Sequence, residues 1–137
     1  MQGPARGRLL VVEDDELVRE LLGLAASDAG LETILARDDQ AAMAAIEALD
    51  GDDLMAVVTD VELGGRRDGW LVAEFARAHL PDVPVVYVSG AGGHGWAKRG
   101  VSGSLFLGKP ISPYLVIDAV LTLVAQAGRR PRRCAGS

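Results

Sequence analysis

Short apolar runs alternate along this chain with longer segments that repeat apolar residues at helical spacing. The runs cover residues 9–12, 31–36, 55–60, 85–88 and 104–107, and each has the length of a buried strand. Between them, apolar positions recur every three or four residues, which is typical of helices that bury one face. Strands that alternate with helices predict an α/β fold with a parallel sheet and helices on both of its faces.

The expected order of the sheet follows from this alternation. Right-handed crossovers and cover on both faces favour a flavodoxin-like, doubly wound (βα)5 sheet with strand order 2-1-3-4-5. The first helix is expected to end near Gly30, and the others to cover residues 38–49, 70–80, 96–99 and 112–127. The last helix begins with Ser-Pro as cap and first turn, and it is more apolar than one buried face requires. We therefore consider a homodimer through this helix.

Length and charge place limits on the domain organisation. The 137 residues suit one domain over residues 8–127, between a disordered N-terminus (1–7) and a basic, disordered tail (128–137), with no separate output domain. All 19 acidic residues precede residue 128, so the domain should repel nucleic acid, and no DNA is expected as a partner. No apolar run is long enough to span a membrane, so we expect a cytoplasmic protein. The single cysteine, Cys134, excludes a disulfide framework.

Polar residues close four of the five apolar runs. Glu13 and Asp14 follow the first run, Asp60 ends the third, Ser89 follows the fourth, and Lys109 follows the fifth and is one of only two lysines. In strand order 2-1-3-4-5 the first and third strands are neighbours, and open α/β sheets place ligands at the carboxyl ends of their strands. We therefore expect these side chains to converge at one edge of the sheet.

Converging carboxylates require a counter-charge. Two ionised carboxylates about 4 Å apart repel by roughly 4 kcal/mol at an effective dielectric constant near 20, so Glu13, Asp14 and Asp60 need a cation or protonation. Oxygen ligands at an edge open to solvent suit Mg²⁺. A carboxylate nucleophile beside Mg²⁺, a lysine and a hydroxyl donor predicts phosphoryl transfer to Asp60, with Lys109 and Ser89 contacting the phosphoryl oxygens.

The glycine-rich loop at residues 90–95 is the other candidate for phosphate binding. It lacks the Gly-Lys-Ser/Thr ending and the long following helix of a P-loop, so we interpret it as a mobile loop. His94 within it has no second histidine or cysteine nearby and is a poor candidate for a metal ligand.

Four segments, in this order, resemble the receiver domain of two-component response regulators. They are Val-Val-Glu-Asp-Asp at residues 11–15, the strand that ends in Asp60, Val-Ser-Gly at 88–90 and Phe-Leu-Gly-Lys-Pro at 106–110. The resemblance covers nearly the whole chain. It implies that Asp60 accepts a phosphoryl group from a sensor histidine kinase or a histidine phosphotransfer protein.

The resemblance also implies roles for other residues. Glu13 and Asp14 would bind Mg²⁺ together with Asp60 and the backbone carbonyl of Glu62, and Lys109 would contact the phosphate. Ser89 and Phe106 would form a switch pair, in which phosphate draws the serine inward and the phenylalanine follows. Such a domain is not classed as an enzyme, because it catalyses only its own phosphorylation and dephosphorylation.

Three features depart from the family pattern. Leu-Gly-Gly at residues 63–65 replaces a proline-containing turn that the family often has, which resembles a single-domain or hybrid-kinase subgroup. Glu62 adds an acid near the site, which is expected to alter water access and phosphoryl lifetime. The glycine-rich stretch and the short helix at 96–99 should weaken the output surface that the family forms from helix 4, strand 5 and helix 5.

Two other functions are kept as alternatives. The first is a pseudo-receiver that binds partners without phosphorylation. The second is a phosphatase similar to the haloacid dehalogenases, because Asp60 is followed two residues later by Glu62. That family, however, is expected to carry its nucleophile on the first strand and usually has a cap domain.

Overall fold

The computed structural model describes residues 7–49, 53–66, 68–90 and 95–128. They form one parallel sheet in the order β2-β1-β3-β4-β5, which confirms the predicted flavodoxin-like topology. The strands are β1 (Arg8–Val12), β2 (Thr33–Ala36), β3 (Leu54–Asp60), β4 (Val85–Ser89) and β5 (Leu105–Gly108). Cys134, His94, most of the glycine-rich loop and most of both expected tails lie outside the described residues.

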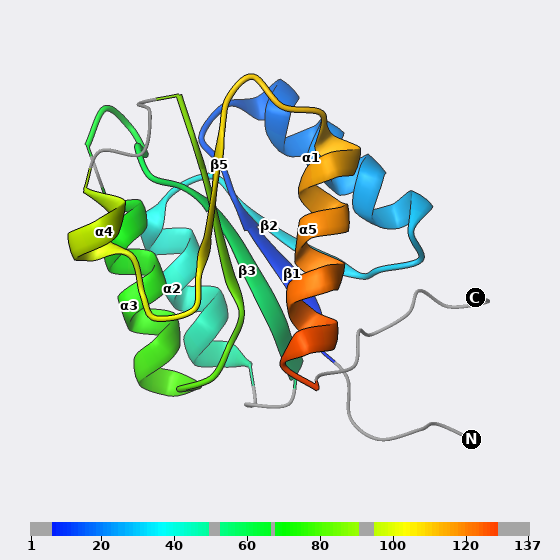
Figure 1. Cartoon of the computed structure of the whole chain (residues 1–137). Helices are drawn as coiled ribbons and strands as arrows, with labels where there is room; N and C mark the ends of the chain where they lie inside the picture. Colours follow the sequence, from blue (N-terminus) through cyan, green and yellow to red (C-terminus); the bar gives the residue numbers. More distant parts are fainter. Residues whose placement is uncertain (1–6, 50–52, 67, 91–94, 129–137) are drawn as a thin grey trace.

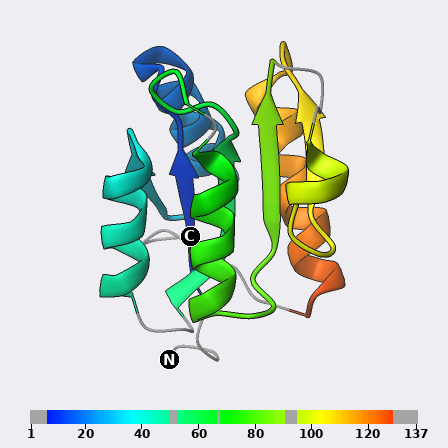
Figure 2. The same ribbon diagram turned by 90° about the vertical axis from the view of Figure 1, so that its left-hand side faces the viewer.

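Helices cover both faces of the sheet. They are α1 (Glu16–Asp28), α2 (Asp39–Ala48), α3 (Gly69–His79), α4 (Trp96–Arg99) and α5 (Pro113–Gln126). Figure 1 shows α1 and α5 on one side of the sheet and α2, α3 and α4 on the other, and the rotated view in Figure 2 agrees. Each face has its own apolar cluster, and every residue of the central strand β3 is buried between them. The sheet therefore provides a rigid base for the residues at its edge.

Three of the helices, α1, α2 and α5, begin at a short polar side chain that caps them. Asp15 accepts a hydrogen bond from the N–H of Val18, Asp38 accepts one from Ala41, and Ser112 accepts one from Tyr114. Ser112 thus caps α5, as the sequence predicted, and four apolar residues of this helix are buried: Val116, Ile117, Val120 and Val124.

The second strand is shorter than the sequence suggests. It begins at Thr33 and not at residue 31, because the N–H of Leu31 donates to the carbonyl of Ala26 and closes the end of α1. Gly30 makes this turn possible with a φ of 80°. The apolar side chain of Leu31 is nevertheless buried, so its hydrophobicity reflects packing in the core and not membership of the strand.

A close approach fixes the start of α3 against the end of β3. Gly69, the first residue of α3, lies so near the backbone carbonyl of Asp60 that a Cβ atom would overlap it. The N–H of Gly69 also donates to the carbonyl of Val61 over 2.8 Å. Only glycine permits this contact, which holds the backbone around Asp60 in place.

Among the described residues, no helix combines the length and apolar character that crossing a membrane requires.

Candidate phosphoryl-acceptor site

Three carboxylates meet at the carboxyl end of the sheet. Glu13 and Asp14 directly follow β1, and Asp60 is the last residue of the neighbouring strand β3. One carboxylate oxygen of each lies within 4.8 Å of the others. The chain therefore gathers these acids because β1 and β3 are adjacent and parallel, as their positions at the strand ends led us to expect.

The three acids differ in burial and in partners. Glu13 is 2% exposed and Asp60 7% exposed, whereas Asp14 is exposed. The N–H of Glu62 donates to Asp60 Oδ1 over 3.0 Å, and the N–H of Asp15 donates to Glu13 Oε2 over 3.1 Å. The two buried carboxylates are thus held in place by backbone donors.

Lys109 supplies the positive charge of the site. Its Nζ lies 2.8 Å from Asp60 Oδ2 and 2.9 Å from Glu13 Oε1. Its backbone N–H donates to the carbonyl of Ser89, so the end of β5 is tied to the end of β4. Burial alone would lower the pKa of the Lys109 ammonium, but hydrogen bonds to Asp60 and Glu13 outweigh this effect and raise it. Lys109 is therefore charged at neutral pH.

One ammonium does not balance three carboxylates. Burial raises the pKa of Glu13 above its usual value, and the charge of Asp60 adds to this effect against the opposing influence of Lys109 and Asp15. Burial alone would raise the pKa of the Asp14 carboxyl, but hydrogen bonds from the N–H of Gly64 and with Glu13, together with the charge of Lys109, outweigh it and lower the pKa. The ionised form of Glu13 is thus disfavoured in the folded protein, and an additional cation would stabilise it.

The arrangement fits a Mg²⁺ ion. The site offers only oxygen ligands, and exposed Asp14 leaves it open to water, which Mg²⁺ usually retains in its coordination shell. Even at 4.8 Å, the largest separation among these oxygens, two ionised carboxylates repel by about 3.5 kcal/mol at an effective dielectric constant of 20. A divalent cation would convert this repulsion into attraction.

Comparison with known proteins agrees with this chemistry. The family model described as the response regulator receiver domain matches residues 9–121. The chain belongs to this family. No significant match to a curated protein sequence was found.

Three solved structures illustrate the similarity to other receivers. A response regulator receiver protein from Sinorhizobium medicae WSM419 is 30% identical, with a TM-score of 0.81 over 89% of this chain and 97% of the other. The receiver domain of the hybrid histidine kinase CckA is 27% identical, with a TM-score of 0.71 over 86% and 99% of the two chains. NtrX from Brucella abortus is 28% identical, with a TM-score of 0.74 over 90% of this chain and 28% of that longer one.

Ser89 and Phe106, the expected switch pair of this receiver, lie on neighbouring strands. Ser89 ends β4 and is 1% exposed, while Phe106 lies in β5 opposite Tyr87 and is partly buried against the cluster beneath α2 and α3. The ring of Phe106 lies 6.2 Å from that of Trp96 in α4. These positions suit a route from the acid site to α4.

Some features of the site were not found from the sequence. The N–H of Gly64 donates to Asp14 Oδ2, and a guanidinium nitrogen of Arg19 donates to the carbonyl of Glu13. Trp96 folds back so that its Nε1 donates to Ser104 Oγ over 3.0 Å. The sequence carried one indication of the Gly64 contact, because the two successive glycines at residues 64 and 65 favour a tight turn. Glu62, whose backbone carbonyl was the expected fourth Mg²⁺ ligand, is exposed, and its backbone N–H donates a hydrogen bond to Asp60 Oδ1.

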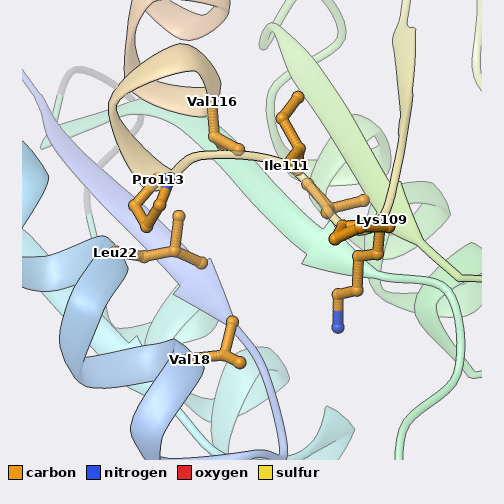
Figure 3. A pocket seen from close by; sticks show the side chains of 8 residues that line it. Val18, Leu22, Lys109, Ile111, Pro113 and Val116 are labelled. Carbon is orange, nitrogen blue, oxygen red and sulfur yellow. The ribbon is translucent and has the colours of Figure 1, made fainter.

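An apolar pocket of about 450 Å³ lies beside Lys109. It lies between α1, β4, α5 and the loop that joins β5 to α5. Figure 3 shows the aliphatic part of Lys109 at its rim, with the amino group directed away from the apolar side chains. The lining residues are Val18, Leu22, Val88, Lys109, Pro110, Ile111, Pro113 and Val116. The acid site therefore borders a surface that can accept an apolar side chain of another protein.

Proposed function

We propose that this receiver is switched by phosphorylation of Asp60. A carboxylate oxygen of Asp60 would attack the phosphorus of a phosphohistidine on a sensor histidine kinase or a histidine phosphotransfer protein. The phosphorus–nitrogen bond would break as the new phosphorus–oxygen bond forms, and the imidazole nitrogen would leave with the bonding electrons. The observation that carries this proposal is the buried Asp60, paired with Lys109 and placed beside two further acids at a sheet edge.

The other residues of the site would prepare this reaction. Glu13, Asp14, Asp60 and the backbone carbonyl of Glu62 would hold Mg²⁺, which when bound lowers the charge on the phosphoryl oxygens. The Lys109 ammonium donates a hydrogen bond to Asp60 in the structure and would move to a phosphoryl oxygen. Ser89 Oγ would donate a hydrogen bond to another phosphoryl oxygen. These groups would stabilise the charge of the transferring group without exchanging protons with it.

We propose that the signal then leaves through Phe106. When Ser89 turns towards the phosphoryl group, it vacates space next to Phe106, and the ring can move inward. Because the Phe106 ring lies near Trp96, this movement would change the packing of α4. The signal would therefore pass from β5 to α4.

The phosphodonor is expected to dock beside the acid site. Leu17, Leu21 and Leu24 on α1 are between 41% and 64% exposed, and they recur at the spacing of one helical face. This face adjoins the apolar pocket through Val18 and Leu22. A helical donor that places apolar side chains here could bring its phosphohistidine to Asp60.

The proposal also includes action without an attached output domain, either as a direct effector or as a phosphate relay.

Tyr114 and Leu115 of α5 are 54% and 57% exposed, and they would supply the surface for a homodimer through this helix. Sedimentation of the protein with and without beryllofluoride would test the dimer. A monomer in both states would exclude it.

Beryllofluoride, which mimics a phosphoryl group, tests the proposal directly. With Mg²⁺ it should change the tryptophan fluorescence of the wild type, because Trp96 lies near Phe106 and Trp70 is buried in the core. Asp60→Asn should not respond. Mg²⁺ binding without any response to beryllofluoride or to a phosphodonor would indicate a pseudo-receiver, and repeated turnover of a generic phosphate ester would indicate a phosphatase. Either result would refute the proposal.

A further inference from the structure

A two-residue hairpin lies between β3 and α3. Leu63 and Arg66 pair through both backbone hydrogen bonds, of 2.7 and 3.2 Å, and the two residues between them form the turn. Gly64 and Gly65 have φ values of 63° and 80°. Two successive positive φ angles correspond to a type I′ turn, which favours glycine or asparagine at these positions. The Gly-Gly pair therefore specifies the shape of this loop.

The hairpin reaches one acid of the receiver site. The N–H of Gly64 donates to Asp14 Oδ2 over 3.0 Å, although the two residues are 50 positions apart in the sequence. Glu13 and Asp60 are buried and bonded to Lys109. Asp14 is instead exposed, and this long-range contact adds to its hydrogen bond with Glu13 in orienting its side chain.

We propose that the 63–66 hairpin is a positioning element for the cation site and that the N–H of Gly64 holds Asp14 in the orientation that binds Mg²⁺. The inference rests on the proposed function, because it assigns a role within the same site. A partner that orients a metal ligand commonly raises metal affinity by about 10- to 100-fold. An oriented carboxylate loses less conformational freedom when the ion binds, and the hydrogen bond favours its ionised form.

The position of the donor makes the inference specific to this chain. A proline in this turn would have no N–H to donate. Leu-Gly-Gly in this chain provides a donor at residue 64, and in the observed turn with positive φ this N–H points to Asp14. A receiver with this hairpin would bind Mg²⁺ through a more rigid aspartate.

Three variants at one position separate the N–H donor from the shape of the turn. Gly64→Pro removes the donor and cannot adopt a φ of 63°. Gly64→Asn keeps the donor and is favoured in a type I′ turn. Gly64→Ala keeps the donor but strains the turn, and it serves as the milder test if the proline variant does not fold. Gly103→Ala is the matched control, because Gly103 has a φ of 73° and, like Gly64, would place a Cβ with no atom within 4 Å.

Mg²⁺ dissociation constants from tryptophan fluorescence, with melting curves in EDTA, provide the measurement. We expect Gly64→Pro to weaken Mg²⁺ binding by about 10-fold or more, Gly64→Ala to weaken it less, and Gly64→Asn to remain near the wild type. Gly103→Ala should lose stability but keep its affinity. In an Asp14→Ala background, the effect of Gly64→Pro on affinity should largely disappear.

Several results would overturn the inference. They are wild-type affinity in both Gly64→Pro and Gly64→Ala, an equal loss in Gly103→Ala, or an undiminished effect of Gly64→Pro when Asp14 is absent. Failure of the proposed function would be distinguishable, since the wild type itself would then bind no Mg²⁺ or would not respond to beryllofluoride.

Discussion

Replacing Lys109 by methionine should make the stability of this receiver depend on Mg²⁺. The ammonium lies 2.8 Å from Asp60 and 2.9 Å from Glu13, and these two side chains are only 9% and 3% exposed. Removing one member of a buried ion pair typically costs about 3 to 5 kcal/mol. Because the Lys109 side chain is 27% exposed, water screens part of this interaction, and we expect a loss of about 2 to 3 kcal/mol without metal.

Protons and Mg²⁺ should each reverse this loss. The pKa of Glu13 is already raised in the folded wild type, and it should rise further without Lys109, which lowers it. A raised folded pKa gives stability at low pH that is lost as the pH rises through that pKa. The loss of folding stability in Lys109→Met should therefore be complete at pH 7 and should shrink as the pH falls towards 4.5, the ordinary pKa of a glutamate side chain. Mg²⁺ should stabilise the variant more than the wild type.

Urea unfolding in EDTA and in Mg²⁺, at several pH values, measures these effects. Lys98→Met is the matched control, because Lys98 is the other lysine of the chain and lies exposed on α4. It should behave as the wild type. Equal stability of Lys109→Met and the wild type in EDTA at pH 7 would refute the electrostatic account, as would an equal gain from Mg²⁺ in both proteins.

Three further predictions concern individual residues. Without metal, Glu13→Gln should be more stable than the wild type at neutral pH and lose this advantage towards pH 4.5, because a raised folded pKa means that the charged form costs stability; urea midpoints across pH check it. Gly69→Ala should destabilise the domain by about 2 kcal/mol or more, since its Cβ would overlap the Asp60 carbonyl; a wild-type melting temperature would contradict this. Phe106→Ala should keep beryllofluoride binding but lose its effect on Trp96 fluorescence; an unchanged fluorescence response would exclude the proposed route.

The sequence predicted the fold well because hydrophobic periodicity determines it. Apolar runs and helical spacing predicted, in the correct order, the five strands and five helices found among the described residues. The misplaced start of β2 has a physical cause. Leu31 is apolar and buried like a strand residue, but its N–H closes α1 by bonding to Ala26. Periodicity reports burial, whereas strand boundaries depend on where the backbone hydrogen bonds go.

The acid cluster could be anticipated from topology, but its hydrogen bonds could not. Residues at the ends of adjacent parallel strands must converge, so the meeting of Glu13 and Asp60 follows from the strand order. The bond between Gly64 and Asp14 instead requires a specific turn, with two positive φ angles, at a specific distance from β1. Trp96 is a similar case, because its fold-back depends on the lack of a side chain at Gly100 and on a hydroxyl at Ser104. Local sequence patterns do not show which residues such contacts will join.

The electrostatic imbalance of the site gives a physical basis for switching. Three carboxylates face one ammonium, and the raised pKa of Glu13 shows that Lys109 does not fully compensate for burial and repulsion. A cation that binds here would relieve the repulsion among the carboxylates and could then offset the negative charge of an incoming phosphoryl group. Because Lys109 also ties β5 to β4 through the carbonyl of Ser89, any movement of Lys109 towards a phosphoryl oxygen acts on both strands that carry the switch pair. In the proposed switch, loss of the ion pair between Lys109 and Asp60 would therefore accompany the movement of Ser89 that frees space for Phe106.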